Sequence, residues 1–436
     1  MNEKIFDVTI ITEGLNGLLI AYELSKAGVS INLIDNYKPS FEIDGYIFDT
    51  YPGYIFSYAG LPNVFRQLNI PFETYINPVL QLILPDRRID IYSNVHRCIA
   101  EIRRRFNTLA TDIVEYILKE QAIINLLETL KLFESPDSHA LNPIIKRLYT
   151  RHLLAREGRN MSKTYRKLLS DNTTSVFIQA LQTHAFPWYN ERKPLQGIPA
   201  ILQKRFYPVG GIGAIKNVII DKIRKQNVNV VQNKVITNIA HEKHFTISLD
   251  HKELINSKFV VAEPLYENSL SLISKYMHTQ IEKNFYVDNV FIGIHRMCLP
   301  EVYNRVNYAI LISDYKNPLF NDNLIFMFNN PISDIKRAKD EMTALTISYL
   351  IPGDSITRLS SIREAVINHI KHFMPFFDDY AEKIYFTEPY ILWNNTHVPL
   401  NKRGVWLLND EFIKNYTYDK KYAYIENTAK KIISRL

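Results

Sequence analysis

Residues 5–36 read IFDVTIITEGLNGLLIAYELSKAGVSINLIDN, and this stretch decides the fold. Phe6–Thr12 is rich in β-branched and apolar residues, Leu15–Ala27 has the spacing of a helix, and Ser30–Ile34 is a second β-rich run. Gly28 stands where a helix would end. The order strand, tight turn, helix, strand predicts a βαβ unit.

The turn of this unit carries part of a dinucleotide-binding fingerprint. The full motif is G-x-G-x-x-G, in which the first glycine makes the turn, the second admits the pyrophosphate and the third lets helix and strand pack. The chain reads TEGLNG at residues 12–17, so Thr12 replaces the first glycine while Gly14 and Gly17 keep the other two. Asp35 ends the second strand, where an acidic residue binds a ribose hydroxyl. The alternative is an ordinary βαβ unit, and we expect Glu13 to repel a pyrophosphate unless it points away.

Composition narrows the class of protein. The chain has 436 residues, 46% of them apolar, enough for two domains with a sizeable core. Only 14 glycines are present, which limits the places where a backbone can approach a phosphate. Two distant cysteines, no secretory segment and no long apolar run favour a cytoplasmic protein that is soluble or membrane-peripheral.

After a long, mostly helical region, the chain again shows a glycine motif followed by a helix and β-rich segments. Residues 62–188 are predicted to be mostly helical, and a second glycine motif, YPVGGIGA at residues 207–214, precedes a helix and the β-rich segment Val228–Ile239. We therefore predict an α/β protein made of two interleaved domains. The first comprises residues 1–66, 196–262 and 384–436, and the second comprises residues 67–195 and 263–383.

Four segments resemble, in their order and spacing, the phytoene-desaturase branch of the flavin amine oxidase superfamily. They are FDTYP at residues 48–52, YPVGGIGA at residues 207–214, Asn330-Pro331 with Asp334, and GVWLLND at residues 404–410. The resemblance implies a Rossmann-like FAD/NAD(P)-binding domain interleaved with an α+β substrate domain. It also implies FAD contacts from Gly210, Gly211, Gly213, Val235 and Asp410, with Val235 at the backbone-contact position of a strand against the adenosine half of FAD.

All the departures from the family pattern occur at positions that are expected to contact the cofactor. A Gly-Gly-Arg loop is missing after Asp35, Tyr51 replaces a glycine, and Asn409 replaces a pair of small residues. Tyr422 and Tyr424 stand where the last helix of the family usually carries Gly or Ala. Because FAD is held by close main-chain approach and helix dipoles, each bulky residue removes a contact. Two hypotheses follow: an FAD-dependent oxidoreductase acting on a hydrophobic or amine-bearing substrate at an atypical FAD site, or a flavin-free pseudoenzyme that uses the fold as a binding or complex-forming subunit.

Other candidate sites are weaker. The histidines form no metal-binding pattern, and no catalytic residue is assigned. Phe186, Trp188, Tyr189 and Trp393 could line a pocket for a hydrophobic small molecule or simply pack in the core. Two basic stretches could contact anionic lipid or a protein partner, or could simply be exposed to solvent. Nucleic-acid binding is a weaker interpretation, because no motif of a known nucleic-acid-binding fold accompanies these charges. These stretches contain Arg97, Arg103, Arg104 and Arg105, and then Arg151, Arg156, Arg159, Lys163, Arg166 and Lys167.

Overall fold

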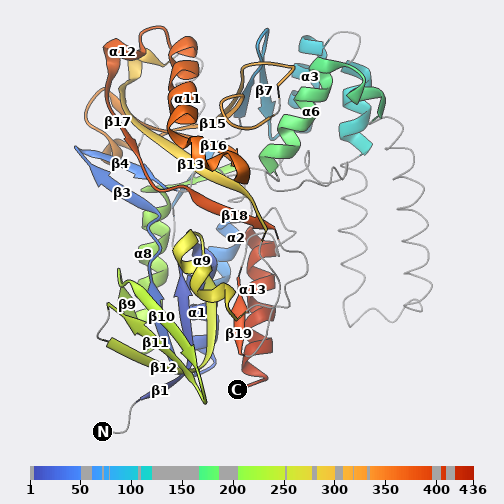
Figure 1. The fold of residues 1–436 in the computed structure, drawn as a ribbon. Helices are drawn as coiled ribbons and strands as arrows, with labels where there is room; N and C mark the ends of the chain where they lie inside the picture. The colour runs from blue at the N-terminus through green and yellow to red at the C-terminus, as the bar shows by residue number, and fades with distance from the viewer. Residues whose placement is uncertain are drawn as a thin grey trace, which may run out of the picture.

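The computed structural model shows two large β-sheets, one above the other in Figure 1, with the two chain termini at the end of the lower sheet. The part of the chain that it describes comprises residues 4–50, 61–70, 73–77, 79–106, 110–119, 166–185, 205–250, 253–276, 282–299, 308–317, 319–330, 334–394, 404–408 and 418–436.

The lower sheet has seven strands within the described residues. Its parallel part runs in the order β12-β1-β2-β9 with β19 beside β12, and β10 and β11 continue it as antiparallel strands. Val8, Ile10 and Ile11 of β1 are fully buried, as expected for a parallel strand covered on both faces. The strands are β1 (Ile5–Thr12), β2 (Ile31–Asp35), β9 (Asn229–Gln232), β10 (Ile236–His241), β11 (Phe245–Leu249), β12 (Glu253–Glu263) and β19 (Val405–Leu407).

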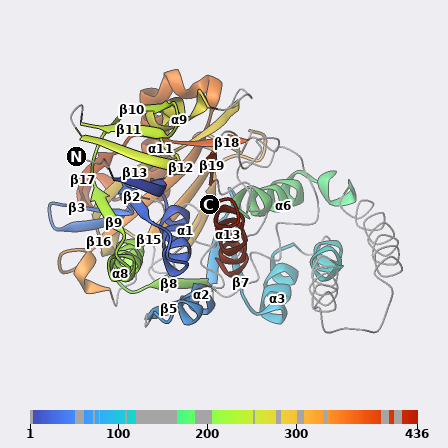
Figure 2. The same ribbon diagram turned by 90° about the horizontal axis from the view of Figure 1, so that it is seen from below.

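Three helices lie side by side along this sheet (Figure 2). They are α1 (Leu15–Lys26), α8 (Gly211–Arg224) and α13 (Tyr418–Ile433), and α1 contacts both of the others. Residues 15–25 of α1 are all buried, because the helix lies between the sheet and its two neighbours. A shorter helix, α9 (Glu267–Ser274), follows β12 and contacts β10.

The upper sheet has eight described strands and is antiparallel except where β14 meets β6. Its two longest strands, β13 and β16, pair with each other, and β17 and β18 both pair with β13. The strands are β6 (Val79–Ile83), β7 (Arg88–Tyr92), β13 (Glu282–His295), β14 (Tyr308–Ile312), β15 (Leu324–Asn329), β16 (Met342–Pro352), β17 (Ala381–Phe386) and β18 (Tyr390–Asn394). Helical segments beside them are η3 (Arg296–Cys298), η4 (Ile335–Arg337), η5 (Gly353–Arg358), α11 (Leu359–Phe373) and α12 (Phe377–Tyr380).

The described part of the chain also contains two small sheets, three further helices and helical residues at 110–119 and 166–169. The hairpin of β3 (Ser40–Ile43) and β4 (Tyr46–Asp49) follows β2, and β5 (Thr74–Asn77) pairs with β8 (Arg205–Pro208) just before the second glycine motif. The helices are α2 (Leu61–Gln67), α3 (Val95–Phe106) and α6 (Asn172–Ala185).

The predicted fold class is confirmed: a Rossmann-like α/β domain is joined to a second domain with its own sheet. Three details differ. Residues 74–77, 79–83 and 88–92, predicted to be helical, form β5, β6 and β7. RIDIY of β7 alternates in burial and makes an antiparallel pair with VLQLI of β6, which is buried except at Val79. Residues 384–386 and 390–394, predicted to belong to the first domain, pair with β13 in the upper sheet. The segment Val228–Ile239 is not one strand: β9 ends at Gln232, and Asn233 turns the chain with φ 55°.

Candidate functional site

The carboxylate of Glu263 lies on the N-terminus of α1. Its Oε1 accepts the N–H of Asn16 at 3.2 Å and its Oε2 accepts the N–H of Gly17 at 2.7 Å. The Thr12 hydroxyl lies 2.9 Å from Oε2. The N-cap residue Gly14 supplies no side-chain cap, so Glu263 provides the acceptors that the first turn needs. In the dinucleotide-binding fold these same N–H groups face the pyrophosphate.

The surviving glycines fit this carboxylate closely. A Cβ on Gly14 would lie 2.5 Å from Oε1 of Glu263, and a Cβ on Gly17 would lie 2.2 Å from Oγ1 of Thr12. Both distances are far below van der Waals contact, so neither position has room for a side chain. Thr12, Gly14 and Gly17 therefore lie together, and the group that they surround is the carboxylate of Glu263.

Glu13 points away from the α1 turn. Its Oε2 accepts the N–H groups of Leu265 at 2.7 Å and Tyr266 at 3.1 Å, and its Oε1 accepts the hydroxyl of Ser269 at the start of α9. Burial raises the pKa of the Glu13 carboxyl, and these three donors only partly offset that effect. The repulsion expected between Glu13 and a pyrophosphate is thus absent, and the carboxylate at that place is Glu263.

Asp35 already has partners at the end of β2. It is fully buried, and its Oδ2 lies 2.9 Å from Nζ of Lys216 and 2.8 Å from Nε2 of Gln232. Its Oδ1 accepts the N–H of Tyr37 at 3.2 Å. A ribose would have to displace Lys216 or Gln232 from this carboxylate. The sequence located Asp35 correctly but gave no sign of these partners, which come from α8 and β9.

Val235 does not lie in a strand against an adenosine. It follows the turn after β9, its side chain is 66% exposed, and both of its backbone polar groups bind Asp250. The Val235 N–H donates to Oδ1 of Asp250 at 3.0 Å, and the Asp250 N–H donates to the Val235 carbonyl at 2.9 Å. The strand position expected for Val235 is therefore not observed, and Asp250 binds both of the backbone groups that were expected to contact FAD. Asp410, Asn409 and Tyr51 lie outside the described residues.

The second glycine motif packs against a buried polar cluster. Gly210 and Gly211 have φ of 78° and 73°, and a Cβ on Gly211 would lie 2.3 Å from Nη1 of Arg337. A Cβ on Gly213 would lie 2.5 Å from Oγ of Ser40. The Gly210 N–H donates to Oδ2 of Asp334 at 3.0 Å. Glycine is therefore needed at Gly210 and Gly211 for their positive φ, and at Gly211 and Gly213 because neighbouring side chains leave no room for a Cβ.

The polar cluster comprises Asp49, Tyr207, Asp334 and Arg337, which the sequence did not single out as a group. Nη1 of Arg337 lies 2.7 Å from Oδ2 of Asp49, and the two side chains are 1% and 2% exposed. Arg337 Nη1 also donates to the Tyr207 hydroxyl, which in turn donates to Asp334 at 3.1 Å. Burial raises the pKa of Tyr207 well above its usual range, although Arg337 opposes the shift. The cluster connects the β3–β4 hairpin, β8 and η4, and so fixes the second glycine motif to the upper domain.

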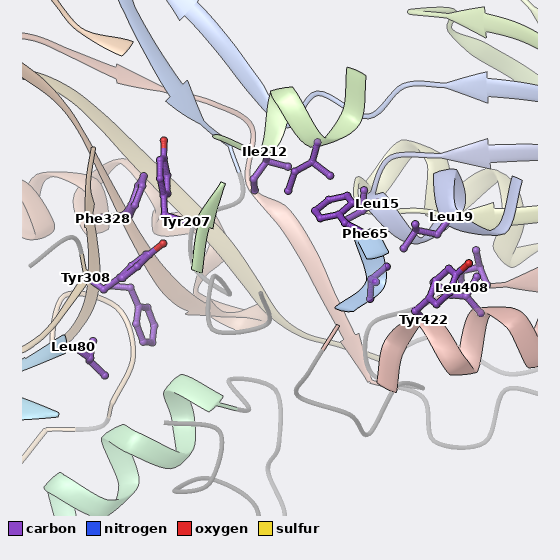
Figure 3. Packing of buried hydrophobic residues seen from close by; sticks show 14 of the residues in the cluster. Leu15, Leu19, Phe65, Leu80, Tyr207, Ile212, Tyr308, Phe328, Leu408 and Tyr422 are labelled. Carbon is purple, nitrogen blue, oxygen red and sulfur yellow. The ribbon is translucent and has the colours of Figure 1, made fainter. Parts of the chain in front are cut away.

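Apolar side chains fill the space beside these turns (Figure 3). Leu15 at the start of α1, Phe65 of α2 and Ile212 of α8 belong to one buried cluster. Tyr422 of α13 joins it and donates its hydroxyl to Glu23 of α1. Tyr422 therefore packs α13 on α1, in place of the small residue that the resemblance implied.

FAD does not fit the described residues as they stand. Glu263 occupies the pyrophosphate position, and Lys216 and Gln232 hold the ribose-binding carboxylate of Asp35. If Glu263 stayed about 4 Å from a phosphate, the like charges would repel by about 4 kcal/mol at an effective dielectric constant of about 20. If it moved, it would give up charge-assisted hydrogen bonds of about 1.5–3 kcal/mol each.

The other candidates show no assembled site. In the described part of the chain, no group of three His, Cys, Asp or Glu side chains is placed to hold a metal ion. Every described helix is too short or too polar to cross a bilayer. In α3, Arg104 and Arg105 both pair with Glu101 at 2.5 Å and 2.9 Å. The second basic stretch up to Lys163, the aromatics at positions 186–189 and the Trp393 side chain lie outside the described residues.

Comparison with known proteins supports the fold alone. The chain matches no protein-family model and no curated protein. RAB GDI from Plasmodium falciparum superposes with a TM-score of 0.59 at 13% identity, over 99% of this chain and 98% of its own. An oxidoreductase from Methanosarcina mazei gives 0.55 at 13% identity, over 93% and 94% of the two chains. Wild-type putrescine oxidase bound to putrescine gives 0.54 at 12% identity, over 99% and 100%. The chain thus shares the two-domain fold of these structures.

Proposed function

We propose that this chain is a flavin-free member of the two-domain flavoprotein fold that acts as a binding or complex-forming subunit. The observation that carries the proposal is that side chains of the protein itself fill both places where this fold would hold a dinucleotide. Glu263 binds the first-turn N–H groups of α1, and Lys216 and Gln232 bind Asp35. The partner would be a protein or a hydrophobic small molecule.

The second candidate is an FAD-dependent oxidoreductase of phytoene-desaturase or amine-oxidase type. It is favoured by the fold, since one neighbour is a putrescine oxidase with bound putrescine and another is named an oxidoreductase. In such an enzyme the flavin would supply the redox chemistry and the protein would position the substrate. Function follows from the site rather than from the fold, and the site favours the first candidate.

The two candidates differ in one measurement. The purified protein is examined for the absorbance of flavin, and its melting temperature is then measured with and without excess FAD. A ligand that binds only the native state must raise the melting temperature. We expect a colourless protein and no shift. A yellow protein, or a melting temperature that rises with FAD, would overturn the flavin-free proposal in favour of the oxidoreductase.

A further inference from the structure

The two turns that follow β1 and β12 exchange carboxylates. The strands are parallel neighbours, with Thr12 opposite Glu263 in the register. Glu263, which ends β12, binds the N-terminus of α1, and Glu13, which follows β1, binds the N–H groups that precede α9. Each carboxylate therefore serves the helix that follows the neighbouring strand. This exchange gives both helices an internal anion where an external one could bind.

The surroundings of the Glu263 carboxylate are those of an oxyanion cradle. Two backbone N–H groups and one hydroxyl converge on its oxygens at 2.7–3.2 Å. The glycines at positions 14 and 17 leave the space that the carboxylate and Thr12 fill. Glu263 is 4% exposed, and the first turn of α1 contains no acidic residue of its own. The cradle is thus complete without an external ligand.

We propose that Glu263 is an internal substitute for a phosphate group and that the N-terminus of α1 is a latent oxyanion site, which opens when this carboxylate is removed. The inference rests on the proposed flavin-free function and extends it, because it says which residue took the place of the ligand. The chemical class of the latent ligand is a phosphate or pyrophosphate. FAD would remain excluded, since Asp35 keeps its partners Lys216 and Gln232 on the adenosine side.

Glu263→Ala tests the site with inorganic pyrophosphate as the probe. Without ligand, we expect this variant to melt below the wild type, because the first turn of α1 loses its acceptors. Pyrophosphate should then raise its melting temperature in a saturable manner, and isothermal titration should show binding at least tenfold tighter than to the wild type. Sodium chloride of equal ionic strength corrects for screening.

Glu13→Ala is the matched control. It removes the other carboxylate of the exchange, which is also buried and bound to backbone N–H groups, but leaves Glu263 on α1. It should lose stability and gain no pyrophosphate binding. If Glu263→Ala does not fold, Glu263→Ser removes the carboxylate but keeps a short polar side chain, and pyrophosphate must stabilise this variant more than the wild type. No response in whichever Glu263 variant folds, or an equal response in the Glu13 variant, overturns the latent site.

The outcomes separate this inference from the proposed function. Wild-type protein that binds FAD would overturn the flavin-free function. Wild-type protein free of FAD, together with a Glu263 variant that ignores pyrophosphate, would overturn the latent site alone. If a Glu263→Ala variant bound FAD as tightly as pyrophosphate, the claim that Lys216 and Gln232 exclude FAD by binding Asp35 would be wrong.

Discussion

Thr12 and Glu263 face each other across the parallel pair β1 and β12, with the Thr12 hydroxyl 2.9 Å from Oε2 of Glu263. Thr12 is therefore more than a lost glycine of a dinucleotide fingerprint, because its hydroxyl helps to hold the carboxylate on α1. The same pair explains why the other two glycines of the motif survive, since both lie against these side chains.

Gly17→Ala should destabilise the protein by about 1–3 kcal/mol, the usual cost of overpacking a tight site. The added methyl would meet Oγ1 of Thr12 at 2.2 Å, and Thr12 is β-branched and cannot swing away freely. In a Thr12→Gly background the same change should cost less. Urea unfolding of the four proteins of this cycle measures the coupling.

Gly213→Ala is the control for this cycle. Its added methyl would meet Ser40 rather than Thr12, so its cost should be the same in both backgrounds within about 0.5 kcal/mol. If Gly17→Ala were also additive with Thr12→Gly, the packing of Gly17 against Thr12 would be refuted.

Glu13 predicts a pH dependence of stability. Burial, opposed by hydrogen bonds from Ser269, Leu265 and Tyr266, raises the Glu13 pKa above its ordinary value of 4.5. The folded state then holds this proton more tightly than the unfolded chain does, so its contribution to stability is full below pH 4.5 and is lost as the pH rises through the raised pKa. Glu13→Gln cannot titrate, so its unfolding free energy relative to wild type should increase over this range. Urea unfolding at several pH values measures the difference, and a constant difference would contradict it.

The ion pair of Arg337 and Asp49 should be costly to break. Both side chains are almost fully buried, so Arg337→Met leaves an uncompensated carboxylate and should destabilise the protein by about 3–5 kcal/mol. Adding Asp49→Asn should recover part of this loss in urea unfolding. Lys383→Met, which breaks the exposed pair with Asp44, should have no measurable effect. Equal effects of the two single changes would show that the buried cluster is not a structural connection.

We propose that the exposed arginines of α3 contact anionic lipid. Arg103→Glu with Arg104→Glu should then weaken sedimentation with phosphatidylserine vesicles, because clustered basic residues gain about 1 kcal/mol each near such a surface. Lys430→Glu with Lys431→Glu, at the end of α13, makes the same change in net charge elsewhere. Equal sedimentation of the two double variants would remove the proposal.

Local patterns in the sequence predicted most of the first domain. Periodicity located β1, α1 and β2, and the glycine motifs identified the turns that precede α1 and α8. Glu263 could not be assigned in the same way, because it lies 246 residues from Gly17 in the sequence and meets it only through the pairing of β1 with β12. A signal was present in the sequence, since Glu263 directly follows the β-rich run FVVA at residues 259–262. The fingerprint assumes that its ligand is external, and nothing in the spacing of Thr12, Gly14 and Gly17 shows that the protein supplies its own.

Lys216→Met should destabilise the protein because it removes the ion-pair partner of a fully buried carboxylate. Lys216 Nζ lies 2.9 Å from Oδ2 of Asp35, and its side chain is 14% exposed. We expect a loss of about 2–3 kcal/mol in urea unfolding, below the about 3–5 kcal/mol of fully buried pairs, since Gln232 and the Tyr37 N–H still bind Asp35. Adding Asp35→Asn should restore part of the loss, because no buried charge then remains. If the double variant were less stable by the simple sum of the two single changes, the two residues would not act as a pair, and the ribose-binding position would not be closed by Lys216.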